Sequence, residues 1–287
     1  MYDVIIIGKG PAGISASLYA KRGNLHTLVI GKDSGVLSTA HWVENYYGTG
    51  GKISGEELVQ KGIRQAESIG VEIKTEEVLH IDYEGTFNVV TQKNTYSSKT
   101  IILATGAKRN VPKIAGVKEY EGKGVSYCAI CDAFFYRGKD IAVLGNGDYA
   151  VHEAMQLLPI AKSVTMLTNG KEPILTRTAN MKTNTKPIRE FRGDTTLQSV
   201  TFEDDSNLPV SGVFIAEGTA SSTDLARKLG IQIQGNTIVV NEKMETNIPG
   251  FYAAGDCTGG ILQIAKAVYE GAKAGMEVIG YVRKDGK

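Results

Sequence analysis

A strand, a glycine-containing turn and a helix follow one another twice in this chain, and this repeated unit constrains the fold more than any other feature. Residues 2–7, YDVIII, are a short apolar run that predicts a strand buried on both faces. The turn GKGPAG (8–13) follows, then a helical stretch that we expect to end at Gly23, and a second strand over 26–31. In this context a GxGxxG turn predicts a nucleotide site, because small residues admit a pyrophosphate to the amide groups at the helix start.

The second copy of the unit begins in the middle of the chain. Residues 140–144, DIAVL, predict a strand, and the turn GNGDYA (145–150) follows it. A helix is expected over 151–159 and a further strand over 162–167. Two such units suggest one domain for each of two cofactors, or one working and one vestigial nucleotide site.

Two later segments belong with the first unit. The stretch KTIILATGA (99–107) predicts a strand that ends in a glycine turn, and 248–260 predicts another that ends in Gly255-Asp256 before an amphipathic C-terminal helix. The fold class is therefore α/β, with two dinucleotide-binding, Rossmann-like three-layer domains, the second inserted into the first. The predicted boundaries are 1–113 with 243–287 for the first domain, and 114–242 for the second.

Composition excludes several classes of function. The net charge of +1 provides no basic field for nucleic acid and no polybasic membrane anchor. No apolar run reaches the roughly 18 residues of a membrane span, and no signal peptide precedes the first strand, so we expect a cytoplasmic protein. Three cysteines are too few for a disulfide framework.

The pair Cys128 and Cys131, in YCAICD, is either a redox dithiol or half of a zinc site. The second half of a zinc site is missing: Cys257 stands alone, and the four histidines lack ligand spacing, so no metal site is expected. CxxC spacing at a helix start puts two thiols within disulfide reach, with the first thiolate stabilised by the helix dipole. Cys257 is expected to be a small buried residue.

The motifs in combination resemble the low-molecular-weight bacterial thioredoxin reductases. GxGxxG at the start, ATG at 104–106, CxxCD at 128–132, GxGxxA at 145–150 and AAGD at 253–256 carry the resemblance, which covers nearly the whole chain. It implies FAD in the first domain, a redox-active CxxC in the second, thioredoxin as the partner that is reduced, and a homodimer.

The resemblance also assigns site residues. Those assigned to FAD are Gly8, Gly10, Pro11, Ala12 and Gly13 in the first turn, Asn45 near the flavin, Ala104, Thr105 and Gly106 in a second turn, Gly255 and Asp256 at the ribityl chain, and Gln263 beside the isoalloxazine with Ile264 after it.

The same resemblance implies three catalytic roles. Cys128 matches the thiol that attacks the substrate disulfide, Cys131 the thiol that faces the flavin, and Asp132 the acid that protonates the leaving thiolate. For Asp132 the alternative stays open that it is a simple helix-start carboxylate, because acidic residues favour that position.

The second nucleotide unit departs from the family. The family carries a His-Arg-Arg after the second strand for the 2′-phosphate of NADP, whereas this chain has Thr168, Asn169 and Gly170, with only Lys171 basic nearby. The chain is most similar in this respect to the clostridial ferredoxin-dependent flavin thioredoxin reductases. Reduced ferredoxin is therefore the expected donor, and its iron–sulfur cluster must lie on the partner, because this chain has too few cysteines to hold one.

Other donors and functions stay open. NADPH or NADH bound weakly at 145–150 is one alternative, a flavin disulfide oxidase of the same fold is another, and a non-catalytic flavoprotein is a third. An acidic ferredoxin would dock on basic residues, for which Lys9, Lys108 and Arg109 are candidates, although ordinary solvated charges explain them equally well.

Overall fold

The structure, a computed structural model, describes residues 1–107, 112–176 and 181–285. The chain divides into two compact units: unit 1 is 1–109 with 221–287, and unit 2 is 110–220. Unit 2 is thus inserted into the sequence of unit 1. The segment 221–242, which we expected in the second domain, lies with unit 1 because its helix α5 (Ser222–Lys228) packs on strand β4 (Val78–Tyr83).

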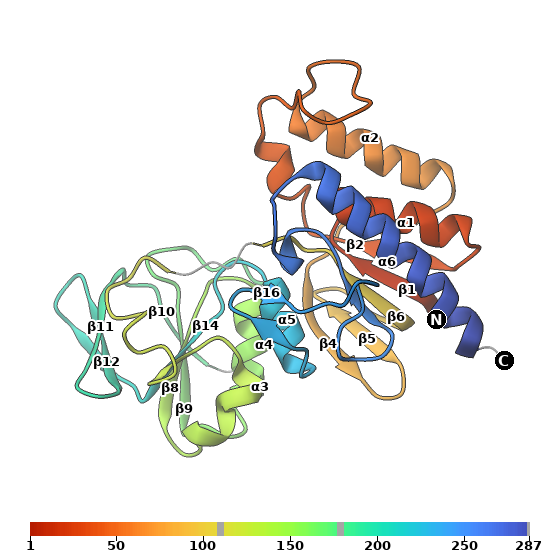
Figure 1. Ribbon diagram of the computed structural model, residues 1–287. Coiled ribbons are helices and arrows are strands. Elements are labelled where there is room, and N and C mark those ends of the chain that lie inside the picture. Colours follow the sequence, from red (N-terminus) through yellow and green to blue (C-terminus); the bar gives the residue numbers. More distant parts are fainter. Residues whose placement is uncertain (108–111, 177–180, 286–287) are drawn as a thin grey trace. The chain divides into compact units, whose positions relative to one another are not determined.

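Unit 1 is built on a seven-stranded sheet in the order β3-β2-β1-β6-β5-β4, with β17 paired to β6 (Figure 1). Strands β1, β2, β3, β6 and β17 run parallel, and β4, β5 and β6 form an antiparallel meander. The strands of this sheet are β1 Tyr2–Ile7, β2 Thr27–Ile30, β3 Glu72–Lys74, β4 Val78–Tyr83, β5 Phe87–Thr91, β6 Thr95–Leu103 and β17 Phe251–Ala253. A separate two-stranded sheet consists of β15 Ile233–Gln234 and β16 Thr237–Ile238. The predicted first strand is thus confirmed over its whole length.

The helices of unit 1 are α1 Pro11–Arg22, α2 Gly55–Ser68, α5 and α6 Ile264–Asp285, with 3-10 turns η1 Val36–Thr39 and η3 Asp256–Thr258. Helices α1, α5 and α6 contact strands of this sheet, whereas α2 packs on α1 and η1. Helices α1 and α6 lie side by side (Figure 1) because small residues face one another: a side chain at Gly271 would collide with the carbonyl oxygen of Ala12. Buried aliphatic residues of β1, α1 and α6, such as Ile6 and Val278, form one core.

Unit 2 repeats the motif on a parallel sheet in the order β10-β9-β8-β14-β7, flanked by a three-stranded antiparallel sheet, β11-β12-β13. Its strands are β7 Val125–Ser126, β8 Asp140–Leu144, β9 Ser163–Leu167, β10 Lys182–Asn184, β11 Ile188–Gly193, β12 Leu197–Phe202, β13 Asn207–Pro209 and β14 Gly212–Ile215. Its helices are α3 Ala129–Asp132 and α4 Asp148–Leu157, with the 3-10 turn η2 Ala133–Tyr136. The α/β class with two Rossmann-like domains is therefore confirmed.

None of the helices in the described ranges combines the length and the apolar character that crossing a membrane requires.

Candidate functional site

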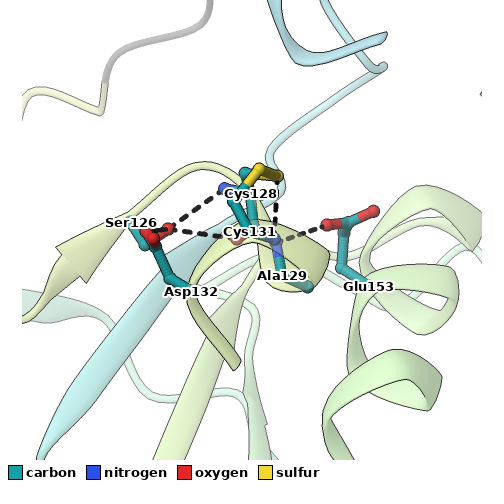
Figure 2. The surroundings of a disulfide bond; sticks show 6 residues. All are labelled: Ser126, Cys128, Ala129, Cys131, Asp132 and Glu153. Carbon is teal, nitrogen blue, oxygen red and sulfur yellow. Dashed lines mark hydrogen bonds between the residues drawn. A yellow bond between two sulfur atoms is a disulfide. The ribbon is translucent and has the colours of Figure 1, made fainter. Parts of the chain in front are cut away.

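Cys128 and Cys131 are joined by a disulfide at the start of α3, a form of the pair that does not bind zinc (Figure 2). Cys128 is the N-cap of the helix, and its sulfur accepts a hydrogen bond from the backbone N–H of Cys131 at 3.2 Å. Helix α3 has only four residues, so its dipole is small, and this direct N–H contact is the main local stabilisation for a thiolate on Cys128.

Asp132 lies beside the disulfide and is held there by Ser126. The Ser126 hydroxyl donates to Asp132 Oδ2 at 2.6 Å and accepts from the backbone N–H of Cys128 at 3.1 Å. One hydroxyl thus ties the carboxylate to the backbone of the first cysteine. Ser126 was not among the predicted residues, although its place two residues before the CxxC motif could have indicated it.

Glu153 approaches the redox helix from the other side (Figure 2). It belongs to α4, is 2% exposed, and its Oε2 accepts from the backbone N–H of Ala129 at 3.2 Å. A buried carboxylate of the nucleotide-type helix therefore binds the first amide of the redox helix. Sequence reasoning missed Glu153, because helical periodicity placed it on α4 without indicating which element α4 would pack against.

The two sulfur-bearing side chains differ in exposure. Cys128 is buried, at 3% exposure, whereas Cys131 is exposed. If Cys128 is the attacking thiol, as predicted, it must become accessible during the reaction. Phe134 and Phe135, in the 3-10 turn η2 that follows α3, are 73% and 67% exposed.

The glycine turn of unit 1 is built as expected for a nucleotide site. Gly8 has φ 120°, and a side chain there would collide with the carbonyl oxygen of Ala104. Gly10 faces open space, and Pro11 is the first residue of α1, which leaves the amides of Ala12 and its neighbours at the open helix end.

The other predicted FAD segments meet this turn at one edge of the sheet. Ala104 N donates to Ile7 O at 2.8 Å, so the turn with Thr105 and Gly106 begins beside the end of β1. The next strand, β17, ends beside β6, and Ala254 N donates to Leu103 O at 3.0 Å. These contacts put the Gly255-Asp256 turn next to the other two. The carboxyl ends of parallel strands are where such folds bind ligands.

Asn45 and Gln263, predicted separately, are brought together: Asn45 Nδ2 donates to Gln263 Oε1 at 3.3 Å. Ile264 begins α6 directly after Gln263 and lines a cavity of 190 Å³ beside the first turn, together with Lys9, Gly10, Pro11 and Tyr46. These features fit FAD: a glycine turn that leaves room for a pyrophosphate, a cavity beside that turn, and a pair of polar side chains next to the cavity.

The turn at Gly255 is braced by α6. Glu270 Oε2 accepts from the backbone N–H of Gly255 at 2.8 Å, and Lys266 Nζ donates to the carbonyl oxygen of the same residue at 2.8 Å. Both backbone groups of Gly255 are thus held by side chains of one helix. This bracing holds the position of Asp256, the next residue in the chain.

Two predicted residues have different surroundings from those expected. Lys9 is 8% exposed and donates to Thr75 Oγ1 at 2.9 Å, and burial lowers its pKa, so it is not an open docking charge. Lys108 and Arg109 lie outside the described residues. Cys257 is buried, as expected, and burial raises its pKa to about 12.

At the end of β9, where the family carries its arginines, the residues of this chain make contacts within unit 2. Thr168 is buried, and Asn169 has φ 50° with its side-chain oxygen accepting from Ile188 N at 2.7 Å. The nearby amine of Lys171 pairs with Glu217 at 2.7 Å. None of these side chains forms a cationic site for a 2′-phosphate.

Comparison with known proteins identifies the family. Residues 2–271 match the pyridine nucleotide-disulphide oxidoreductases. This chain belongs to that family. A thioredoxin reductase from Listeria innocua is 36% identical to it over 303 residues, covering 99% of this chain and 95% of the relative.

Solved structures of the same family are also similar. The chain matches an atypical thioredoxin reductase from Desulfovibrio vulgaris Hildenborough with a TM-score of 0.94 and 39% identity, over 99% of both chains. It matches a ferredoxin-flavin thioredoxin reductase from Clostridium acetobutylicum with a TM-score of 0.73 and 32% identity, over 99% of this chain and 98% of the other. The chain is therefore a flavoprotein disulfide oxidoreductase of the thioredoxin reductase family, and its cofactor is FAD.

Proposed function

We propose that this protein reduces the disulfide of thioredoxin through Cys128 and Cys131, with electrons from reduced ferredoxin rather than from NADPH. The observation that carries the choice of donor is the end of β9. There the side chain of Asn169 accepts a hydrogen bond from Ile188 N and the amine of Lys171 pairs with Glu217, so neither of these described side chains provides a free cation for a nucleotide. The likeness to a ferredoxin-flavin thioredoxin reductase supports the same donor. The proposal includes a homodimer, as the resemblance implies, and a location in the cytoplasm.

The electron balance fits this assignment. Two reduced ferredoxins each supply one electron, and FAD, when bound, converts these single electrons into the pair that a disulfide accepts. The Cys128–Cys131 bond breaks as it takes up two electrons and two protons. The dithiol then attacks the thioredoxin disulfide, a mixed disulfide forms and resolves, and thioredoxin leaves with two thiols.

In this scheme the residues of the chain handle protons and orientation. Asp132, held by Ser126 at 2.6 Å, lies beside the disulfide and can donate a proton to the thiolate that leaves. Gly8, Gly10 and Gly13 would hold the pyrophosphate of FAD at the start of α1, and Asp256 would hold the ribityl chain.

We propose that thioredoxin binds a surface of unit 2 beside the redox helix. The exposed rings of Phe134 and Phe135 follow the redox helix, and a cavity of 520 Å³ lined by Phe135, Tyr136, Lys123 and Lys139 adjoins them. Large exposed aromatic side chains are the residues that most often dominate a protein interface. We expect Phe134→Ala with Phe135→Ala to raise the KM for thioredoxin by roughly tenfold or more, while reduction of the pair by dithiothreitol is unchanged.

The donor is tested by anaerobic mixing. The protein, with FAD bound, is mixed with reduced ferredoxin, NADPH or NADH while the flavin absorbance is followed, and thioredoxin thiols are then counted. We expect rapid bleaching and thioredoxin reduction with ferredoxin alone. Rapid bleaching of the flavin by NADPH would show that the nucleotide, and not ferredoxin, is the electron donor. Dithiol-dependent peroxide production that exceeds thioredoxin reduction would point instead to a disulfide oxidase.

Cys128→Ser serves as the matched control in this assay. It should still be bleached by ferredoxin, because the flavin site lies in unit 1, and should not reduce thioredoxin. A Cys128→Ser variant with full thioredoxin reduction would exclude the pair as the route of electrons.

A further inference from the structure

The side chain of Lys9, in the glycine turn of unit 1, runs along the edge of the sheet. The residue is 8% exposed, and its amine donates to Thr75 Oγ1 at 2.9 Å. Lys9 comes two residues after the end of β1, and Thr75 follows β3 directly. Because β2 lies between β1 and β3 in the sheet, the side chain crosses the carboxyl end of β2.

Gly31, the first residue after β2, leaves room for this path. A side chain at Gly31 would lie 2.8 Å from Lys9 Cγ and 3.5 Å from Lys9 Cβ. The aliphatic part of Lys9 therefore packs directly on the end of β2. Any residue larger than glycine at position 31 would displace it.

In a dinucleotide fold, the ribose of the adenosine half binds at the end of the second strand, where an acidic side chain accepts from its hydroxyl groups. This chain has Gly31 at that place. Asp33, two residues further on, uses Oδ1 to accept from Gly35 N at 2.9 Å within its own turn. The side chain that covers the end of β2 is thus the cationic one of Lys9.

The Lys9 amine has donors left for a ligand. An ammonium group carries three N–H donors. Within the described ranges, the amine of Lys9 makes a single hydrogen bond, to Thr75. Lys9 also lines the cavity of 190 Å³ beside the turn, so the residue borders space that a ligand can enter.

We propose that Lys9 binds the ribose hydroxyl groups of the adenosine half of FAD, in place of the acidic side chain that other dinucleotide turns use. A hydroxyl group can accept from an ammonium as well as donate to a carboxylate, so the exchange of charge is chemically consistent. FMN lacks the adenosine half, and Lys9 therefore contributes to the selection of FAD over FMN. The inference concerns the cofactor and goes beyond the proposed donor and substrate.

The test compares the affinities for FAD and FMN. Bound FAD is removed, and each flavin is titrated into wild type, Lys9→Met and Lys99→Met while the quenching of flavin fluorescence is followed. Lys99→Met is the matched control, because Lys99 is a lysine of the same sheet that pairs with Asp3 near the start of β1. We expect Lys9→Met to bind FAD roughly tenfold or more weakly than wild type and FMN as wild type does. The control should bind both flavins as wild type does.

Two outcomes overturn the proposal: an unchanged affinity of Lys9→Met for FAD, or an equal loss of affinity for FAD and FMN, which would assign Lys9 to the phosphate or to the fold of the turn. If Lys9→Met does not fold, wild type is titrated with an FAD analogue whose adenosine ribose lacks the 2′ and 3′ hydroxyl groups. This analogue should bind roughly tenfold or more weakly than FAD, and equal affinities would overturn the proposal. Ferredoxin and thioredoxin are absent from these titrations, so a failure here is distinct from a failure of the proposed function.

Discussion

Two carboxylates flank the redox disulfide. Each is connected to the CxxC segment by hydrogen bonds, but through a different group. Asp132 is tied through the hydroxyl of Ser126, and Glu153 through the backbone amide of Ala129. Glu153 takes an amide that would otherwise be available to a thiolate on Cys128. We expect a negative charge at this place to disfavour a second negative charge on the sulfur of the reduced pair.

Glu153→Gln should therefore make the reduced pair more reactive, because the amide oxygen still accepts from Ala129 while the charge is gone. We expect alkylation of the reduced pair at neutral pH to be about 3- to 10-fold faster. The rate is measured with iodoacetamide and peptide mass spectrometry. Glu119→Gln, an exposed carboxylate of the same unit, should leave the rate unchanged. An unaltered rate in a folded Glu153→Gln protein would contradict the electrostatic role.

Cys257 should behave in the opposite way from the redox pair. Burial raises its pKa to about 12 from 9.0, so the thiol stays protonated and inaccessible. Since the folded-state pKa is raised, this group stabilises the fold below pH 9, and its contribution is lost as the pH rises from 9 towards 12. We expect native, reduced protein to label rapidly at the exposed Cys131, and Cys257 to label only after denaturation. Rapid native labelling of Cys257 would contradict its burial.

Among the elements, the contact between α1 and α6 determines how unit 1 is assembled. Helix α6 comes from the end of the chain and packs on α1 because glycines allow close approach. Gly271 faces the backbone of Ala12, and a side chain at Gly275 would lie 2.5 Å from Ala16 O. Ala12 belongs to the predicted FAD turn, so this packing also supports the cofactor site.

Gly271→Ala should destabilise unit 1 by about 1–3 kcal/mol, since the added methyl group collides with backbone that cannot move aside. Gly280→Ala, in the same helix but with open space around it, should be neutral or stabilise the protein by up to about 1 kcal/mol. Thermal or urea unfolding of both variants measures the difference. Equal effects of the two substitutions would show that close packing at Gly271 does not matter.

The whole molecule consists of two units whose cores are separate, with unit 2 inserted between the two segments of unit 1. Each glycine turn belongs to a different unit, and the redox disulfide belongs to unit 2. A ligand of one unit should therefore stabilise that unit more than the other.

Removal of FAD is expected to lower the stability of unit 1 selectively. At a free concentration one hundred times its Kd, FAD raises the free energy of unfolding of the unit that binds it by about 2.7 kcal/mol. Differential scanning calorimetry of the FAD-bound and FAD-free protein should therefore move the transition of unit 1, with hydrogen exchange assigning each transition. If removal of FAD shifted only the unfolding transition of unit 2, the assignment of the FAD site to unit 1 would be wrong.

Local patterns in the sequence were sufficient for strands β1, β2, β6, β8, β9 and β17, for the two glycine turns and for the CxxC pair, whereas the antiparallel strands β4, β5 and β11 to β13 were not predicted. A run such as 2–7 and a turn such as 8–13 are governed by neighbours a few residues apart, which periodicity and glycine placement report directly. The α/β class and the membership of the thioredoxin reductase family follow from the order of these patterns along the chain.

Contacts between distant residues depended on the packing of whole elements. Glu153 meets Ala129 only because α4 packs on α3, and Asn45 meets Gln263 across most of the chain. The hydrogen bonds from Thr176 to Asp148 likewise depend on where the chain runs after β9. Helical or strand periodicity gives the face on which a side chain lies, and not the element that covers that face, so these partners could be found only in three dimensions.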